Sequence, residues 1–204
     1  MLPIAQPSPV PSLFDLLPAE GDRRWVQNMA RNLSFLADMI PADLLIYCPV
    51  GPDQPNQFVV MAEAKPAVRE SFYRKSQVNQ VCELDDSSAI LQAFQTGKIT
   101  AGAIGKVING QPMAQMAYPL RTSRRHSCGI LVVERNLYEE LKHTEDKKNI
   151  YRLSIQRSVE TILEKSRHID VPLPSIQPGD ALLLINDNHI IKHASHSAIN
   201  LARR

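Results

Sequence analysis

The sequence lacks any long hydrophobic run. Its longest uninterrupted apolar runs, such as residues 181–185, are a few residues long, whereas a membrane-spanning helix needs roughly 20 apolar residues. The first ten residues also lack a basic start followed by an apolar stretch, the pattern of a secretory signal. We therefore expect a cytoplasmic protein that makes no membrane contact.

Cysteine is scarce, and no two cysteines form a CxxC pair. Cys48, Cys82 and Cys128 stand far apart in the chain, which excludes a zinc ribbon and a thioredoxin-type redox site. Their neighbours are largely apolar, so we interpret them as reduced, buried small hydrophobic residues. A sensing thiol is the less favoured alternative.

A strong charge imbalance is also missing. The formal net charge of +2 is too small to indicate a nucleic-acid-binding surface, so we expect no direct nucleic-acid partner. The basic cluster Arg121, Arg124, Arg125 and His126 has no interleaved aromatic residues for base stacking. We interpret it as a solvated loop, with binding of an anionic partner as the alternative.

Motifs for catalysis are absent as well. The sequence contains no Asp-x-Gly-x-Gly and no Gly-x-x-x-x-Gly-Lys motif for ATP, and His143 is interpreted as a loop residue and not as a phosphoacceptor. His189 and His193 would lie roughly 13 Å apart on a strand, and no carboxylate or thiolate completes a ligand set with His196. We expect no catalytic residue, no metal and no cofactor in this chain, and no enzymatic activity of its own.

The N-terminal part combines a proline-rich arm with an amphipathic helix. Five prolines in residues 1–18 exclude regular structure there. Residues 22–39 are predicted to be one helix that ends at Pro41. Its apolar residues follow the 3-4 spacing of a helix seam, which either packs on its own domain or forms a dimer contact: Val26, Met29, Leu33, Leu36 and Ile40.

The period then changes to that of β-strands. Residues 43–48 and 57–64 form a predicted hairpin, and 65–85 a long connection with a short strand near 78–82. A helix over 87–96, capped by Asp85 or Asp86, should end at Gly97. Strands follow at 101–107, 112–121 and 127–134, and Asn109-Gly110 predicts a hairpin turn. This order describes an α+β fold, an antiparallel sheet with helices on one side.

A second long helix is predicted over residues 146–167. Its apolar stripe is a further candidate dimer contact and consists of Tyr151, Ile155, Val159 and Ile162. Residues 169–176 read as a linker, and 181–186 and 189–193 as two short strands. Two strands and the start of a helix cannot close a core, so residues 177–204 look like the incomplete beginning of a further domain.

Several stretches, taken in order, resemble the GAF-type sensor domain of cytoplasmic, PdtaS-like two-component histidine kinases. They are residues 62–66, 71–74, 89–97, 117–121 and 128–134. Residues 177–204 are similar to the opening of the PAS domain that follows in those kinases. One departure is Asn79, where the family would have glycine. The resemblance assigns residues 19–168 to the GAF-like domain.

The resemblance implies a sensory input region that works as a homodimer. A kinase core that uses ATP and magnesium and a response regulator as its partner would belong to residues beyond 204. A small ligand would bind between the sheet and the long connections, with six candidate contacts: Tyr47, Phe58, Tyr73, Arg74, Gln115 and Tyr118. Two alternatives stay open: a GAF domain of a transcriptional or cyclic-nucleotide-responsive regulator, and a small enzyme such as the free methionine sulfoxide reductases.

Overall fold

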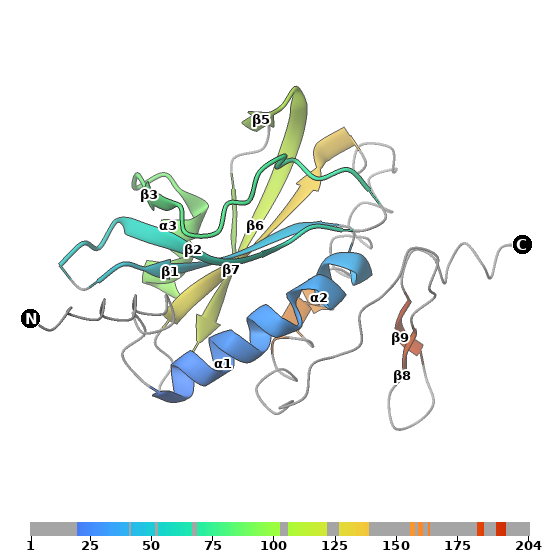
Figure 1. Ribbon diagram of the computed structural model, residues 1–204, viewed down its shortest axis with the longest axis horizontal. Coiled ribbons are helices and arrows are strands. Elements are labelled where there is room, and N and C mark those ends of the chain that lie inside the picture. The colour runs from blue at the N-terminus through green and yellow to red at the C-terminus, as the bar shows by residue number, and fades with distance from the viewer. Residues whose placement is uncertain are drawn as a thin grey trace, which may run out of the picture.

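A seven-stranded antiparallel sheet organises the chain (Figure 1). The computed structural model describes residues 20–40, 42–51, 53–66, 69–102, 106–121, 127–138, 156–157, 159–160, 163, 183–185 and 191–194. The strand order is β3-β2-β1-β7-β6-β4, and β5 pairs with β6. The strands are β1 (Asp43–Pro49), β2 (Gln57–Ala64), β3 (Val81–Glu83), β4 (Thr100–Ala101), β5 (Lys106–Ile108), β6 (Gln111–Arg121) and β7 (Ser127–Asn136). The predicted α+β class is confirmed.

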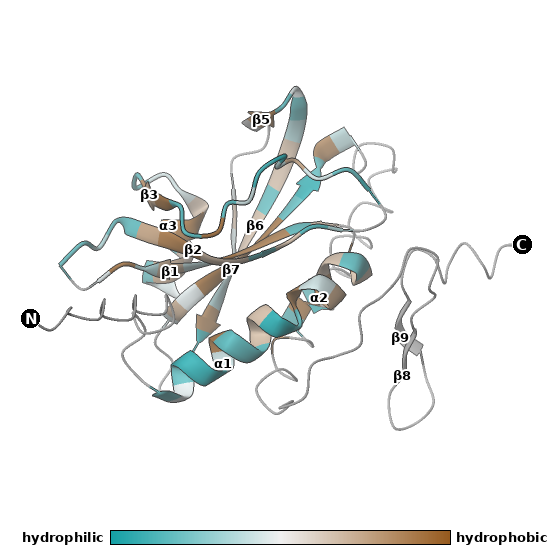
Figure 2. Cartoon of the chain, viewed as in Figure 1, coloured by the Kyte–Doolittle hydropathy of each residue, from teal (hydrophilic) through white to brown (hydrophobic). Residues whose placement is uncertain are grey.

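The central strands β1 and β7 are buried on both faces. Eight consecutive residues of β7, from Cys128 to Arg135, are buried, as are the first four of β1. A strand covered on both sides has no reason to alternate polar and apolar residues. Their aliphatic runs therefore mark the middle of the sheet, and Figure 2 shows hydrophobic colour where β2, β1 and β7 lie side by side.

The hairpin of β5 and β6 turns at Asn109-Gly110, as predicted. Both residues have positive φ, +50° and +79°, and Ile108 pairs with Gln111 across a two-residue loop. This conformation suits asparagine and glycine better than other residues. The strand predicted over 101–107 is instead divided into β4 and β5, which both pair with β6.

Two helices, α1 (Glu20–Arg31) and α2 (Leu33–Met39), take the place of the single helix predicted over 22–39. The break falls at Asn32, whose side-chain amide donates a hydrogen bond of 2.9 Å to the carbonyl of Asn28. Such a side-chain bond competes with the helical backbone ladder.

The apolar seam of these helices packs on its own sheet. Val26, Met29, Leu33 and Leu36 are almost wholly buried, together with Leu44, Ile46 and other residues of β1 and β2. We call this side of the sheet the α1 face. A dimer contact stays a prediction, but these four side chains leave no surface for it.

The helix α3 (Ala89–Thr96) lies on the opposite side, which we call the α3 face. Ile90 and Ala93 pack there against Leu45, Ile130 and other apolar residues. The prediction of helices on one side only is therefore wrong. Ser88, and not Asp85 or Asp86, is the N-cap residue; Asp85 instead accepts hydrogen bonds from Ser87.

The end of α3 agrees with prediction. Gly97 adopts a left-handed conformation, with φ of +62°, and its N–H donates to the carbonyl of Ala93 at 2.9 Å. Glycine takes up this conformation without the steric cost of a Cβ atom.

Little of the predicted second helix can be described. Residues 156–157, 159–160 and 163 are helical, and Val159 is buried in the core of the α1 face. Tyr151, Ile155 and Ile162 lie outside the described residues, as do the arm (1–18) and the linker (169–176). The strands β8 (Leu183–Ile185) and β9 (Ile191–Ala194) form the predicted hairpin, a separate two-stranded sheet. In the described parts of the chain, no helix has the length and apolar character to cross a membrane.

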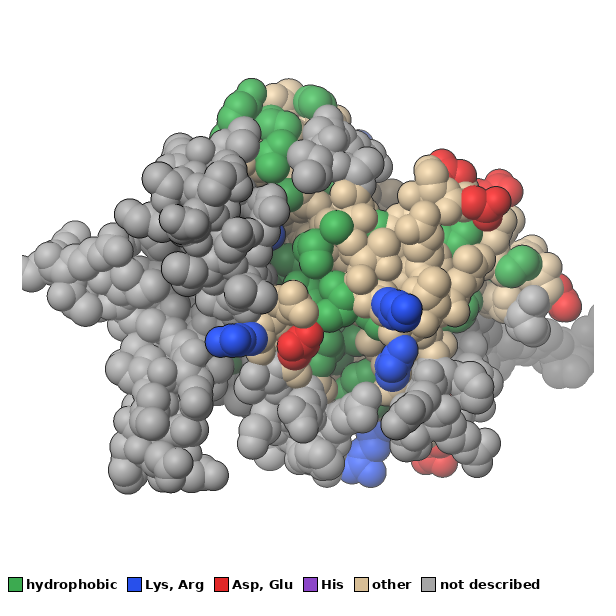
Figure 3. Space-filling view, turned by 180° about the vertical axis from the view of Figure 1, so that it is seen from behind, with side chains coloured by type: hydrophobic (Ala, Val, Ile, Leu, Met, Phe, Trp, Pro, Cys, Tyr) green, Lys and Arg blue, Asp and Glu red, His purple; other side chains and the backbone are tan. Residues whose placement is uncertain are grey.

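The described surface mixes residue types. Seen from behind in Figure 3, hydrophobic side chains gather in the middle of the described part, with basic and acidic side chains around them. Among the described residues, the large hydrophobic ones that are more than half exposed are Val81, Val107 and Tyr138.

Candidate functional site

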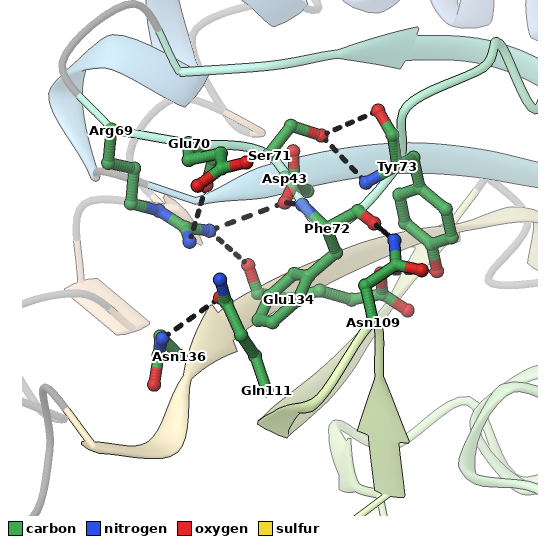
Figure 4. Close-up of polar contacts among 10 residues, drawn as sticks. All are labelled: Asp43, Arg69, Glu70, Ser71, Phe72, Tyr73, Asn109, Gln111, Glu134 and Asn136. Atoms are coloured by element: carbon green, nitrogen blue, oxygen red, sulfur yellow. Dashed lines mark hydrogen bonds and ion pairs between the residues drawn. The ribbon is translucent and has the colours of Figure 1, made fainter.

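A buried carboxylate, Glu134, marks a polar site on the α3 face. Alternate residues of β7 point to the same side of the sheet, and Ile130 and Val132 belong to the core beneath α3. Glu134 continues this row where α3 no longer covers the sheet, and its side chain is only 1% exposed. The residues after β2 cover it instead (Figure 4).

Glu134 brings together two of the predicted ligand-binding residues. Its Oε2 accepts a hydrogen bond of 2.7 Å from the Tyr73 hydroxyl, and its Oε1 accepts one of 2.9 Å from the Gln115 side-chain amide. Because both oxygens act as acceptors, the arrangement fits the ionised carboxylate. Tyr73 comes from the long connection and Gln115 from β6, so the carboxylate joins the connection to the sheet.

Tyr47 completes this group, which we call the Glu134 cluster (Tyr47, Tyr73, Gln115 and Glu134). Burial, followed by the charge of Glu134, raises the pKa of Tyr47 well above its ordinary value. The same two causes, with the hydrogen bond to Glu134, raise the pKa of Tyr73 further. Both phenols are therefore neutral near neutral pH and act as hydrogen-bonding groups.

A second buried carboxylate, Asp43, fastens the connection to β1. Its Oδ2 accepts a hydrogen bond of 2.9 Å from the backbone N–H of Phe72. Arg69 forms an ion pair with the same oxygen at 3.5 Å and donates to the carbonyl of Glu134 at 3.0 Å. Asn109, at the β5–β6 turn, donates to the carbonyl of Phe72 at 2.6 Å. Figure 4 shows these contacts converging on residues 69–73.

The six predicted ligand residues do not form one site. Phe58 is wholly buried and makes an edge-to-face contact with Phe94 of α3, with ring centroids 5.2 Å apart, so it belongs to the core. Arg74 is exposed. Tyr118 packs in the core of the α1 face, on the other side of the sheet from Gln115. The two residues are three positions apart on β6, and an odd spacing on a strand places side chains on opposite faces.

Sequence reasoning missed the residues that hold the site together: Asp43, Arg69, Asn109 and Glu134. The sequence pattern predicts Glu134 only as the end of a strand and Asp43 only as the beginning of one. A carboxylate directly continuous with a run of buried aliphatic residues is unusual, because burying a charge without partners is costly. That signal could have identified both residues.

The described residues offer little evidence for a reactive cysteine or a metal-binding site. Within that part of the chain, no cluster of three or more His, Cys, Asp and Glu residues could hold a metal. Cys48 and Cys128 are buried thiols on the α1 face. Burial, followed by the neighbouring Cys128, raises the pKa of Cys48, which makes its thiolate form scarce. The histidines 189 and 196 lie outside the described residues.

Comparison with known proteins gives the family. The model of the GAF domain of the histidine kinase PdtaS matches residues 17–153, more than half of the chain. The solved sensor region of a sensor histidine kinase is 16% identical, covers 94% of this chain and 67% of its own, and has a TM-score of 0.61. The transcriptional regulator YaiJ is 7% identical over 73% of this chain and 98% of its own, with a TM-score of 0.52.

The two solved structures, at these identities, show a shared fold alone. A comparison with curated proteins found no match. The family match rests on the sequence and covers the whole described sheet with α1, α2 and α3. The chain therefore belongs to the family of GAF domains of the histidine kinase PdtaS, a sensor domain of the type that its sequence motifs predicted.

Proposed function

We propose that this chain is the cytoplasmic input region of a two-component histidine kinase, and that it binds a small ligand at the Glu134 cluster. The observation that carries the proposal is the buried Glu134 carboxylate, held between Tyr73 of the connection and Gln115 of the sheet. Polar groups buried among apolar residues are typical of ligand sites.

A ligand could act on this cluster by exchanging hydrogen bonds. A donor group of the ligand would replace Tyr73 or Gln115 on the Glu134 carboxylate, and Tyr47 would supply an aromatic wall. Loss of the Tyr73 contact would remove one of the hydrogen bonds that hold residues 69–73, while those of Asp43, Arg69 and Asn109 would stay. The connection would then have two arrangements with different ligand affinity, which is the requirement for a population shift.

The relay would pass through the sheet to the helices on its other face. The strand β7 carries Glu134 toward the α3 face, while its neighbour Val133 packs in the same core as α1, α2 and Val159. We propose that these helices form a homodimer through residues outside the buried seam and transmit the change to a kinase core elsewhere in the protein. That core would use ATP and magnesium and would transfer phosphate to a response regulator.

Native mass spectrometry of the purified 204-residue chain tests ligand binding and the dimer together. We expect a dimer and a retained small molecule. If no ligand is retained, metabolite extracts should raise the thermal stability of the protein, and this gain should be lost in Gln115→Leu. Tyr138→Phe, at an exposed position, is the matched control. A strict monomer at high concentration would refute the dimer relay.

Cyclic AMP and cyclic GMP are the discriminating probes for the alternative regulator class. If either nucleotide stabilises the protein and Gln115→Leu removes the effect, the chain senses a cyclic nucleotide. The cyclic-nucleotide-responsive regulator would then be favoured over the histidine kinase. Equal effects of every addition on Gln115→Leu and on the control would refute ligand binding at the Glu134 cluster.

A further inference from the structure

A cleft of about 410 Å³ opens at the end of β6, away from the residues of the Glu134 cluster. It lies where α1, the turn after α3, the end of β6 and the helical residues 160 and 163 meet. Its lining residues are Trp25, Gly97, Ile99, Tyr118, Pro119, Arg121, Glu160 and Leu163. This volume falls within the range of small-molecule sites.

The walls of the cleft are mainly apolar and aromatic. Trp25 and Tyr118 contribute rings, and Ile99 and Leu163 contribute aliphatic surface. Burial raises the pKa of Tyr118 to about 12, so its hydroxyl is neutral near neutral pH. Apolar lining of this kind suits an aromatic ring in the ligand.

Two side chains of opposite charge also line the cleft, and each is held by a hydrogen bond. Arg121 donates a hydrogen bond to the carbonyl of Gly97, the residue that ends α3. Glu160 is exposed, and its Oε1 accepts a hydrogen bond of 2.9 Å from the side chain of Gln156, one helical turn earlier. A guanidinium matches the geometry of a carboxylate, and a carboxylate accepts hydrogen bonds from an ammonium group.

We propose that this cleft binds an aromatic amino acid or a related zwitterion. The ring would lie in the apolar part of the cleft, the carboxylate would meet Arg121, and the ammonium group would meet Glu160. The charge pattern favours a zwitterion, because Glu160 would repel a simple anion and Arg121 would repel a simple cation. The site shares no residue with the Glu134 cluster.

Occupancy of the cleft has a structural consequence for the helices. Trp25 belongs to α1, whereas Glu160 and Leu163 belong to the helical residues that follow the sheet. A ligand that contacts both would fix their relative position. These are the two segments that the proposed relay uses, so such a ligand would modulate signalling from a second site.

Trp25 provides the assay, because it is the only tryptophan in the sequence. The probes are L-phenylalanine, phenylpropanoate, which lacks the ammonium group, and phenethylamine, which lacks the carboxylate. None of them absorbs where tryptophan is selectively excited. We expect a saturable change in Trp25 fluorescence with L-phenylalanine and affinities about tenfold or more weaker for the two analogues.

The variant Glu160→Gln separates the proposal from unspecific binding. Glu160 is exposed, so the substitution should leave the fold intact, which circular dichroism would verify. It should weaken L-phenylalanine binding about tenfold and leave phenylpropanoate binding unchanged or stronger. The matched control is Glu83→Gln, at an exposed position on β3, which should behave as the unsubstituted protein.

Three results would overturn the inference. The first is the absence of a saturable signal up to about 10 mM L-phenylalanine, a concentration beyond the range of specific small-ligand affinities. The second is equal binding of either analogue, and the third is equal behaviour of Glu160→Gln and Glu83→Gln. None of these results bears on the Glu134 cluster, whose own test uses Gln115→Leu.

Discussion

Removing the Tyr73 hydroxyl should destabilise the domain measurably. In Tyr73→Phe the ring stays in place, but the 2.7 Å hydrogen bond to Oε2 of Glu134 is lost. A hydrogen bond to a charged group contributes about 1.5–3 kcal/mol, and a buried carboxylate that loses a donor cannot regain it from bulk water. We therefore expect the free energy of unfolding to fall by about 1.5–3 kcal/mol.

A double-mutant cycle with Glu134→Gln shows whether the loss comes from this contact. The coupling energy between the two positions should be about 1–3 kcal/mol, the range for directly contacting polar groups. Urea denaturation followed by Trp25 fluorescence measures it, because Trp25 is buried in the core of the α1 face and reports on global unfolding.

The control is Tyr138→Phe, at a tyrosine that is 58% exposed. That variant should change stability by less than about 0.5 kcal/mol. If Tyr73→Phe were no more destabilising than the control, or if the coupling energy were near zero, the Glu134 cluster would not hold the connection to the sheet. The proposed ligand mechanism would then lose its basis.

Three further predictions concern backbone geometry and pH. In Gly129→Ala the new Cβ would lie 2.9 Å from the Cys48 sulfur and from a backbone carbonyl oxygen, so the free energy of unfolding should fall by about 1–3 kcal/mol. Gly51→Ala, with nothing within 4 Å, should stay within about 0.5 kcal/mol in the same urea assay. Asn79 has a φ of +71°, so Asn79→Gly should raise the thermal midpoint of unfolding and Asn79→Ala should lower it. The opposite order would contradict a left-handed backbone conformation at this residue. The pKa of Tyr73 is raised in the folded state, so the contribution of this tyrosine to the free energy of unfolding is complete below about pH 10. As the pH rises further, this contribution is lost at about 1.4 kcal/mol per pH unit. Stability measured across this range should fall less steeply in Tyr73→Phe, and equal slopes would exclude the contribution.

Local signals in the sequence predicted the boundaries of several elements well. Gly97 ends α3 and Asn109-Gly110 turns the β5–β6 hairpin because each position requires a positive φ, which few residues adopt. Asn79 illustrates the same rule. Glycine is the residue expected at this position, and asparagine is among the residues that best tolerate a left-handed conformation.

The packing of the helices could not be predicted from periodicity. The 3-4 seam of α1 and α2 fits both a dimer contact and a sheet surface, and the buried side chains show the second use. An apolar stripe specifies that a face is buried but not what covers it. The position of α3 on the opposite face depends on contacts with β6 and β7, which a local pattern does not contain.

The candidate site was only partly predictable for a related reason. Tyr47, Tyr73 and Gln115 were chosen as polar or aromatic residues near the expected pocket, and they do gather around Glu134. Tyr118 was chosen on the same grounds and lies on the other face. The register of β6 decides this difference, and pairing with β7 sets the register.

The alternation of side chains along β6 limits where residues can be inserted into or deleted from this protein. Gln115 reaches one face of the sheet and Tyr118 the other, so both proposed sites depend on a single strand. An insertion or deletion of one residue before Gln115 would exchange the two faces and disable both sites together. Length variation among related sequences should therefore concentrate in the turns that join the strands, and β6 itself should keep a constant length.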